Sequence, residues 1–277
     1  MSPGVILLSP LIDHDFNLPP IAVTAETGDD RVRLAAASLA LELGLPFLDC
    51  DPTATVGRPD LLVVQTAARL ELRETRRGAP RPIYVDFIGG PLGFRRLSGR
   101  SRRQPIAQAV GLRGGPVTVV DATAGLARDS FLLACLGCTV TAIERSPVLA
   151  ALVRDGIIRA EHHSPQLDAV LARFSLVLGD ARNVFRNMTG SDAPDAVYLD
   201  PMYPTGKKAA LVKKEMRVCR QLVGDDPDAG ELLEAACRVA KKRVVVKRQL
   251  HAPPLGPKPT TTHRGTRVRY DVYVMPR

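Results

Sequence analysis

Short runs of apolar residues alternate with longer segments of helical spacing in the second half of the chain. Residues 117–120 form an apolar run that ends at Asp121, and a short turn at 122–126 follows it. The apolar residues from Phe131 to Leu136 recur at helical spacing, and a second apolar run ends on Glu144. This order predicts a strand, a turn, a helix and a parallel strand.

The same two spacings continue to the end of the chain. In residues 267–275 apolar and polar positions alternate, which is typical of a half-exposed antiparallel strand. The stretch 251–263 is rich in Pro and Thr and is expected to be a loop. Further apolar runs predict strands at 174–178, 196–199 and 243–248, and helical spacing predicts helices at 106–112, 147–163, 207–222 and 231–240.

The first part of the chain is predicted to form a separate unit, a small α/β lobe at residues 1–78. Asp29 or Asp30 can cap a helix that runs from Arg31 to Leu43 and ends at Gly44. Nothing in this lobe resembles a catalytic site, so we expect it to stabilise the fold or to orient RNA. Its predicted strands are 5–8, 21–23, 47–50 and 61–64, and the predicted inner face of its helix is Val32, Leu34, Ala35, Leu39 and Leu43.

Positive charge is concentrated between residues 69 and 103. The chain has a formal net charge of +9, and this segment holds ten arginines against three acidic residues. A strand predicted at 83–88 and a return strand predicted at 94–97 flank a glycine-rich turn, so residues 79–104 are predicted to form a basic β-hairpin and an arginine-rich loop. A solvated charged face is the alternative. The functional interpretation is RNA binding through Arg95, Arg96, Arg100, Arg102 and Arg103.

Composition and cysteine usage disfavour several classes of protein. No run of eighteen apolar residues is present and no basic residue precedes the apolar patch at 5–8, so neither a membrane span nor a signal peptide is expected. Five cysteines in 277 residues favour a reducing compartment, and we expect a cytoplasmic protein. Cys135 and Cys138 have the spacing of a metal pair, but they lack a second pair of ligands. Core packing and no metal are therefore expected.

The turn after the strand at 117–120 is acidic and contains a single glycine, Gly125. A dinucleotide fold needs three spaced glycines so that a pyrophosphate can approach a helix N-terminus. Here Asp121 and Asp129 would repel a pyrophosphate, but they suit the sulfonium and ammonium groups of S-adenosylmethionine. Glu144, nineteen residues after Gly125, can hold ribose hydroxyls. A nicotinamide dehydrogenase is disfavoured, and a βαβ unit that binds nothing is the alternative.

A second candidate site follows the strand predicted at 196–199, where the chain continues with Asp200, Pro201, Met202, Tyr203 and Pro204. Methyltransferases that act on exocyclic amines of bases carry this order of residue types. The lone pair of such an amine is delocalised into the ring, so both N–H groups must be bound to direct it. The Asp200 carboxylate and the Pro201 carbonyl can accept these hydrogens, and Tyr203 can stack on the base. These three are the predicted catalytic residues, and a plain turn is the alternative.

Four segments together resemble the ribosomal RNA small subunit methyltransferase J family: 120–131, 199–204, 210–224 and 243–248. The resemblance implies a class I, Rossmann-like methyltransferase fold with a mostly parallel seven-stranded sheet. It also implies S-adenosylmethionine-dependent methylation of the N2 atom of a guanine in 16S rRNA, with S-adenosylhomocysteine as the product. The cofactor contacts that it implies are Asp121, Gly125, Arg128, Asp129, Glu144, Arg145, Asp180, Ala181 and Asp200.

We place the methyltransferase domain at residues 105–277. Its predicted helix at 207–222 lies next to the Asp200 loop, and Lys207, Lys208, Lys213 and Lys214 could guide an RNA backbone. The expected partner is 16S rRNA or the small ribosomal subunit, with no obligate protein partner. An amine methyltransferase acting on DNA adenine or cytosine or on another RNA, and a non-catalytic RNA-binding relic of the fold, stay open. The sequence identifies neither the target nucleotide nor the oligomeric state.

Overall fold

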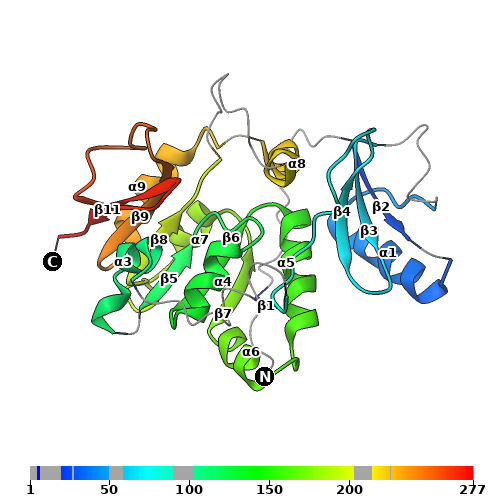
Figure 1. Ribbon diagram of the computed structural model, residues 1–277, viewed down its shortest axis with the longest axis horizontal. Coiled ribbons are helices and arrows are strands. Elements are labelled where there is room, and N and C mark those ends of the chain that lie inside the picture. Colours follow the sequence, from blue (N-terminus) through cyan, green and yellow to red (C-terminus); the bar gives the residue numbers. More distant parts are fainter. Residues whose placement is uncertain are drawn as a thin grey trace.

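Two β-sheets organise the protein in this computed structural model (Figure 1). The structure describes residues 5–6, 20–26, 28–49, 59–89, 103–115, 117–202, 214–224 and 226–276. Within these ranges, the larger sheet has eight strands in the order β1-β7-β6-β5-β8-β9-β11-β10 and the smaller has three in the order β2-β3-β4. None of the described helices combines the length and the apolar character needed to cross a membrane.

The larger sheet confirms the predicted α/β fold. Its first six strands are parallel, while β11 runs antiparallel to β9 and β10 antiparallel to β11. Seven of the strands form the predicted mostly parallel sheet, and β1 adds an eighth at the edge. The strand predicted at residues 5–8 therefore does not belong to the N-terminal lobe, because it pairs with β7 of the larger sheet. The strands are β1 (Val5–Ile6), β5 (Thr118–Asp121), β6 (Thr139–Glu144), β7 (Phe174–Leu178), β8 (Ala196–Leu199), β9 (Arg243–Gln249), β10 (Thr261–Arg264) and β11 (Val268–Val274).

Helices cover both faces of this sheet, because the strand residues alternate between two apolar cores. On β8, Tyr198 joins the core beneath α3, α4, α5 and α6, whereas Val197 joins the core beneath α7 and α9. The helices are α3 (Pro105–Val110), with the 3₁₀ turn η1 (Leu112–Gly114), α4 (Arg128–Cys135), α5 (Pro147–Ala160), α6 (Pro165–Leu171), α7 (Ala181–Asn187), α8 (Lys214–Val223) and α9 (Ala229–Val239). The carboxyl ends of β5, β6, β7 and β8 therefore meet at one edge of the sheet.

The smaller sheet belongs to the predicted N-terminal lobe, and it packs against α1 (Asp30–Leu43). Asp29 caps this helix by accepting a hydrogen bond from the Arg31 N–H at 2.9 Å, and Gly44 ends it in the left-handed conformation (φ 63°). Both ends of the helix are as predicted. Its strands are β2 (Ile21–Ala25), β3 (Leu61–Gln65) and β4 (Leu70–Glu74).

The predicted inner face of α1 was partly wrong. Leu34 is 68% exposed, whereas Ala36 and Ala40 are buried with Val32. Small residues at these positions let the helix lie close to β2 and β3, and the leucine points outward instead. The strand predicted at 47–50 is reduced to a single bridge between Phe47 and Val23.

The strand predicted at 83–88 is also wrong. Only Ile83 pairs, in a bridge with Leu72 of β4, and the residues that follow it form no strand. The apolar alternation has another cause, because Val85 and Phe87 insert into the main core and Phe87 stacks on Phe131 with ring centroids 4.2 Å apart. The predicted return strand at 94–97 lies outside the described residues.

Two features near the C-terminus differ from the prediction: the exposure of β11 and the end of the predicted loop. β11 is buried on both faces rather than half exposed, because residues 249–257 fold back over it: Arg269 donates to the carbonyls of Gln249 and Leu250 and Tyr273 donates to that of Pro257. Part of the stretch predicted as a loop pairs with β11 as β10. The helix predicted at 207–222 is described only from Lys214 onward.

Gly156 sets the distance between α5 and the segment that leaves the smaller sheet. A Cβ atom at this position would lie 2.7 Å from Cγ1 and 2.9 Å from Cβ of Val85, a stiff β-branched side chain. The helix can therefore carry no side chain here without moving that segment.

Replacing Gly156 with Ala should destabilise the protein even though Ala favours helix by about 1 kcal/mol. Overpacking against Val85 should lower the free energy of unfolding by about 1–3 kcal/mol, measured by urea unfolding. The double variant V85A/G156A should recover part of this loss. Gly190→Ala is the matched control, because a Cβ there meets no atom within 4 Å. A G156A protein as stable as the wild type would contradict this packing.

Candidate active site

A cavity of about 600 Å³, counted with its open mouth, lies at the carboxyl ends of β5, β6, β7 and β8. This is where parallel α/β sheets bind ligands. Six of the predicted cofactor residues line it: Gly125, Glu144, Arg145, Asp180, Ala181 and Asp200. The strand ends that carry Glu144 and Asp200 thus open onto the same pocket.

Glu144 is the last residue of β6, and its side chain lines this cavity. Its Oε2 accepts the Gly125 N–H at 2.6 Å, and its Oε1 accepts the Ser146 N–H at 2.7 Å. Gly125 has a positive φ of 55°, a conformation that favours glycine, and this brings its N–H onto the carboxylate. Burial raises the pKa of Glu144, although both N–H donors oppose the shift. The carboxylate thus holds the β5 turn against β6 at the cavity wall.

Asp121 stands behind the cavity rather than on its wall. Its carboxylate accepts hydrogen bonds from the Thr123 N–H at 3.1 Å and from the Ser130 hydroxyl, and its side chain is almost fully buried. Burial raises the pKa of Asp121 to about 7, against the two hydrogen bonds and with a further push from Asp129 and Asp200. Its direct role is to order the turn, and any contact with the cofactor stays a prediction.

The loop that begins at Asp200 is held at two points. The Asp200 N–H donates to the Thr123 hydroxyl at 2.6 Å, which ties the end of β8 to the β5 turn. Two residues later, Met202 exchanges hydrogen bonds with Asp226: its N–H donates to Asp226 Oδ2 at 2.5 Å, and its carbonyl accepts the Asp226 N–H at 3.1 Å. Pro201 is buried between these ties. Asp200 is therefore presented at the cavity from a fixed backbone.

An ammonium group joins the acidic residues of the site. Lys247 Nζ lies 2.7 Å from Asp200 Oδ2 and 2.8 Å from Asp129 Oδ2, and the Tyr198 hydroxyl donates to Asp129 Oδ2 at 2.7 Å. Burial raises the pKa of Asp200, and the charge of Lys247 opposes that shift. Burial alone would lower the pKa of Lys247, but the attraction of Asp200 and Asp129 outweighs it and raises this pKa.

Ion pairs frame the other side of the cavity. Arg145 pairs with Asp226 and, at 3.3 Å, with Asp228. Asp180 caps α7 by accepting the Arg182 N–H at 2.8 Å, and the Arg182 guanidinium also binds its carboxylate. Burial works against ionisation of Asp180, but these bonds from Arg182 prevail and lower its pKa. Asp180 is thus an ionised acceptor at the cavity.

Several known proteins are similar to this chain in sequence, and one of them also in solved structure. The family model "Putative SAM-dependent methyltransferase" matches residues 54–275. The ribosomal RNA small subunit methyltransferase J of Thioalkalivibrio sulfidiphilus is 48% identical over 91% of this chain and 97% of its own, and that of Nitrosococcus oceani is 46% identical over 87% and 93%. This chain belongs to the ribosomal RNA small subunit methyltransferase J family. A solved SAM-dependent methyltransferase from Neisseria gonorrhoeae superposes with a TM-score of 0.67, at 34% identity over 91% of this chain and 95% of that one.

The enzyme is therefore a SAM-dependent methyltransferase, and the cavity fits that cofactor. Glu144 and Asp200 line it, and their contacts with a ribose and with cationic groups stay predictions. Asp180 and Ala181, which also line it, begin α7. The trio of Asp129, Asp200 and Lys247 carries a net negative charge, which suits a sulfonium. The described residues contain no group of three or more His, Cys, Asp or Glu arranged to hold a metal ion.

The predicted site residues divide by position. Asp129 does not line the cavity, but Lys247 links it to Asp200, which does, and Arg128 is exposed at the start of α4. Tyr203 lies outside the described residues, so its stacking role stays a prediction. Sequence analysis missed Lys247, Thr123, Asp226 and Arg182. Only Lys247 gave a signal, as a charged residue at the end of an apolar strand.

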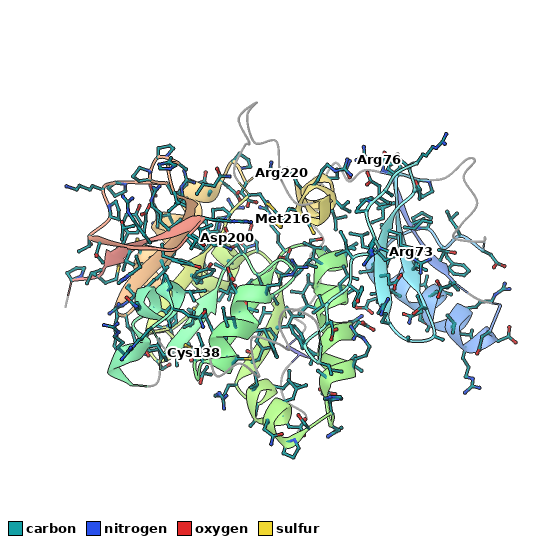
Figure 2. All side chains as sticks on the ribbon, viewed as in Figure 1. Arg73, Arg76, Cys138, Asp200, Met216 and Arg220 are labelled. Atoms are coloured by element: carbon teal, nitrogen blue, oxygen red, sulfur yellow. The ribbon has the colours of Figure 1, made fainter. Side chains whose placement is uncertain are left out.

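Several described arginines of the lobe pair with acidic residues of the same lobe, and the RNA contacts assigned to the basic segment stay a prediction. Arg73 pairs with Glu26 and Glu71 at 2.6 Å, and Figure 2 shows Arg73 and Arg76 on the smaller sheet, away from Asp200. Arg103 is exposed ahead of α3. Lys214 begins α8. The other predicted RNA-binding residues lie outside the described ranges: Arg95, Arg96, Arg100, Arg102, Lys207, Lys208 and Lys213.

Replacing Asp121 with Asn should flatten the pH dependence of stability. The folded pKa of about 7 lies above the ordinary value of 3.8, so the stability that protonation contributes is fully present below pH 3.8 and is lost as the pH rises through 7. Between pH 3.8 and pH 7 the free energy of unfolding of the wild type should fall by up to roughly 4 kcal/mol relative to that of D121N. Urea unfolding of both proteins from pH 4 to 8 checks this, and parallel curves would disprove it.

Glu144→Gln should weaken cofactor binding. One carboxylate oxygen is lost as an acceptor while two backbone N–H groups still need partners, and hydrogen bonds to charged groups are worth about 1.5–3 kcal/mol. The dissociation constant of S-adenosylhomocysteine should rise at least about tenfold, measured by titration calorimetry. Glu234→Gln, at an exposed position on α9, should have no effect. Unchanged affinity in E144Q would show that Glu144 does not contribute to cofactor binding.

Proposed function

We propose that the enzyme transfers a methyl group from S-adenosylmethionine to the exocyclic N2 of a guanine in 16S rRNA. One observation carries this proposal. Asp200, at the end of β8, lines the same cavity as Glu144 and Gly125, and its side chain is 37% exposed there. An acceptor for an aromatic amine therefore lies beside the acceptors for the cofactor.

The chemistry of an aryl amine fits this arrangement. Its nitrogen is a poor nucleophile until both N–H groups are bound and its lone pair points at the electrophilic carbon. The Asp200 carboxylate and the Pro201 carbonyl are the two acceptors that we assign to these hydrogens. S-adenosylmethionine supplies an activated methyl group when it is bound. The nitrogen becomes strongly acidic after methyl transfer, so it can lose its proton without a strong base.

The substrate class rests on the family and on charge. The relatives are named as ribosomal RNA methyltransferases of the small subunit, and this chain has a formal net charge of +9. A basic protein favours a polyanionic partner. We assign phosphate contacts to Arg95, Arg96, Arg100, Arg102 and Arg103 and to the four predicted lysines near α8, and stacking on the guanine to Tyr203. The small ribosomal subunit and free 16S rRNA are both candidate substrates.

Asp200→Ala should abolish methyl transfer. Both the orientation of the amine and the binding of its hydrogens are lost, so the rate should fall at least about 1000-fold, while affinity for S-adenosylhomocysteine should be partly retained. Radiolabelled cofactor incubated with naked 16S rRNA, small subunits, DNA or protein measures transfer and its target. Asp192→Ala is the control, because Asp192 lies in an exposed turn. Label on DNA or protein but not on RNA, or full activity in D200A, would refute the proposal.

A further inference from the structure

Lys247 lies beside Asp200 because of the register of the sheet. β8 and β9 are parallel neighbours whose last paired residues are Leu199 and Val246. The next residue on each strand is Asp200 and Lys247, so the two side chains leave the sheet together at the cavity edge. On the other side of β9, Lys247 is the partner of Tyr270 on β11. Two neighbouring strands thus fix where the ammonium lies.

The contacts of Lys247 are directed at the site. Its ammonium binds Asp200 Oδ2 at 2.7 Å and Asp129 Oδ2 at 2.8 Å, and Tyr198 donates to the same oxygen of Asp129. The three charged side chains are only 20–37% exposed. Burying such a group costs desolvation energy that its ion pairs often fail to recover, so stability alone is a weak reason for it. Asp129, which accepts a hydrogen bond from Tyr198, binds the ammonium on the side away from the cavity. Asp200, which lines the cavity, binds the same ammonium.

We propose that Lys247 is a positioning residue for methyl transfer: it binds Oδ2 of Asp200 and so leaves Oδ1 to accept an N–H of the target amine. This inference rests on the proposed function, in which Asp200 is that acceptor. Asp129 and Tyr198 form the support that aligns Lys247. Lys247 itself touches neither the base nor the cofactor in this role.

Lys247 also keeps Asp200 ionised. Among the described residues, the charged and titratable groups around Asp200 include Asp129 from α4, Asp121 from β5, Asp226 from the segment before α9, Tyr198 on β8 and Lys247 on β9. Of these, Lys247 is the cation. Without it, burial and three neighbouring carboxylates would favour protonation of Asp200. A protonated Asp200 would present a donor to an amine that needs an acceptor.

The test compares full-length wild type, Lys247→Met and Lys247→Arg on small subunits and 16S rRNA. In K247M the kcat should fall roughly 100-fold, as for a small misplacement of a reacting group, while KM and the affinity for S-adenosylhomocysteine change little. The acidic limb of kcat should move to higher pH by about one unit or more, because the pKa of Asp200 rises when its cation is lost. K247R should restore part of the activity. Lys242→Met is the control, since Lys242 pairs with Asp195 at the opposite end of the strand.

A second measurement is independent of RNA. If Lys247 holds Asp200, the melting temperature of K247M should fall more at pH 8 than at pH 5, and D200N/K247M should reduce that difference. Active wild type with K247M of equal kcat and equal acidic limb would overturn the role of Lys247. Wild type that methylates no RNA would refute the proposed function instead. The melting series then tests the contact itself: pH-dependent coupling shows that Lys247 holds Asp200, and its absence overturns this inference.

Discussion

Carboxylates crowd the edge of the sheet where the chemistry takes place, and the structure depends on how each of them is balanced. Asp121, Glu144 and Asp200 end three adjacent parallel strands, β5, β6 and β8, and Asp129 joins them from α4. Carboxylates that lie close together inside a protein repel one another and oppose folding unless each one is protonated, paired with a cation or hydrogen-bonded. The carboxylates are balanced in three different ways, and Asp129 and Asp200 share one of them.

The way in which each carboxylate is neutralised or hydrogen-bonded distinguishes the acidic residue that orders the turn from those that we assign to the active site. Asp121 is buried deepest and has a pKa near 7, so at neutral pH it contributes only part of a charge. Glu144 is satisfied by two backbone N–H groups, which leaves its charge at the cavity wall. Asp129 and Asp200 share one ammonium from Lys247, so this corner carries one net negative charge. This net charge suits a cationic cofactor, and the repulsion that remains between Asp121 and its neighbours Asp129 and Asp200 contributes to the raised pKa of Asp121.

The sequence predicts those parts of the site that depend on local order. Gly125, Glu144 and Asp200 each follow an apolar strand, and the ends of parallel strands share an edge, so their convergence could be expected without coordinates. Lys247 and Asp226 could not be assigned in this way. Lys247 depends on the register between β8 and β9, and Asp226 on a contact with Met202 across 24 residues. Neither relation leaves a pattern in a single sequence.

The alternation of apolar and polar residues led to wrong predictions where the apolar side chains are buried for a reason other than pairing in a half-exposed strand. Val85 and Phe87 alternate with polar residues as a strand would, yet they fill the main core beside Phe131. β11 alternates as a half-exposed strand would, yet the fold covers its polar face with a returning loop. Alternation indicates which side chains are buried, but it does not identify what buries them. Pairing and covering are decided by segments distant in the chain.

The smaller sheet bears on the active site through α8. Glu74 of β4 has a side chain only 2% exposed, and it binds Arg217 of α8 at 2.9 Å. Val218, Cys219 and Leu222 bury the other face of that helix in the main core. The loop after Asp200 is therefore anchored at both ends, by Asp226 at Met202 and by the lobe and core at α8. Tyr203, Lys207, Lys208 and Lys213, to which the proposal assigns base stacking and phosphate contacts, fall in the sequence between these two anchors.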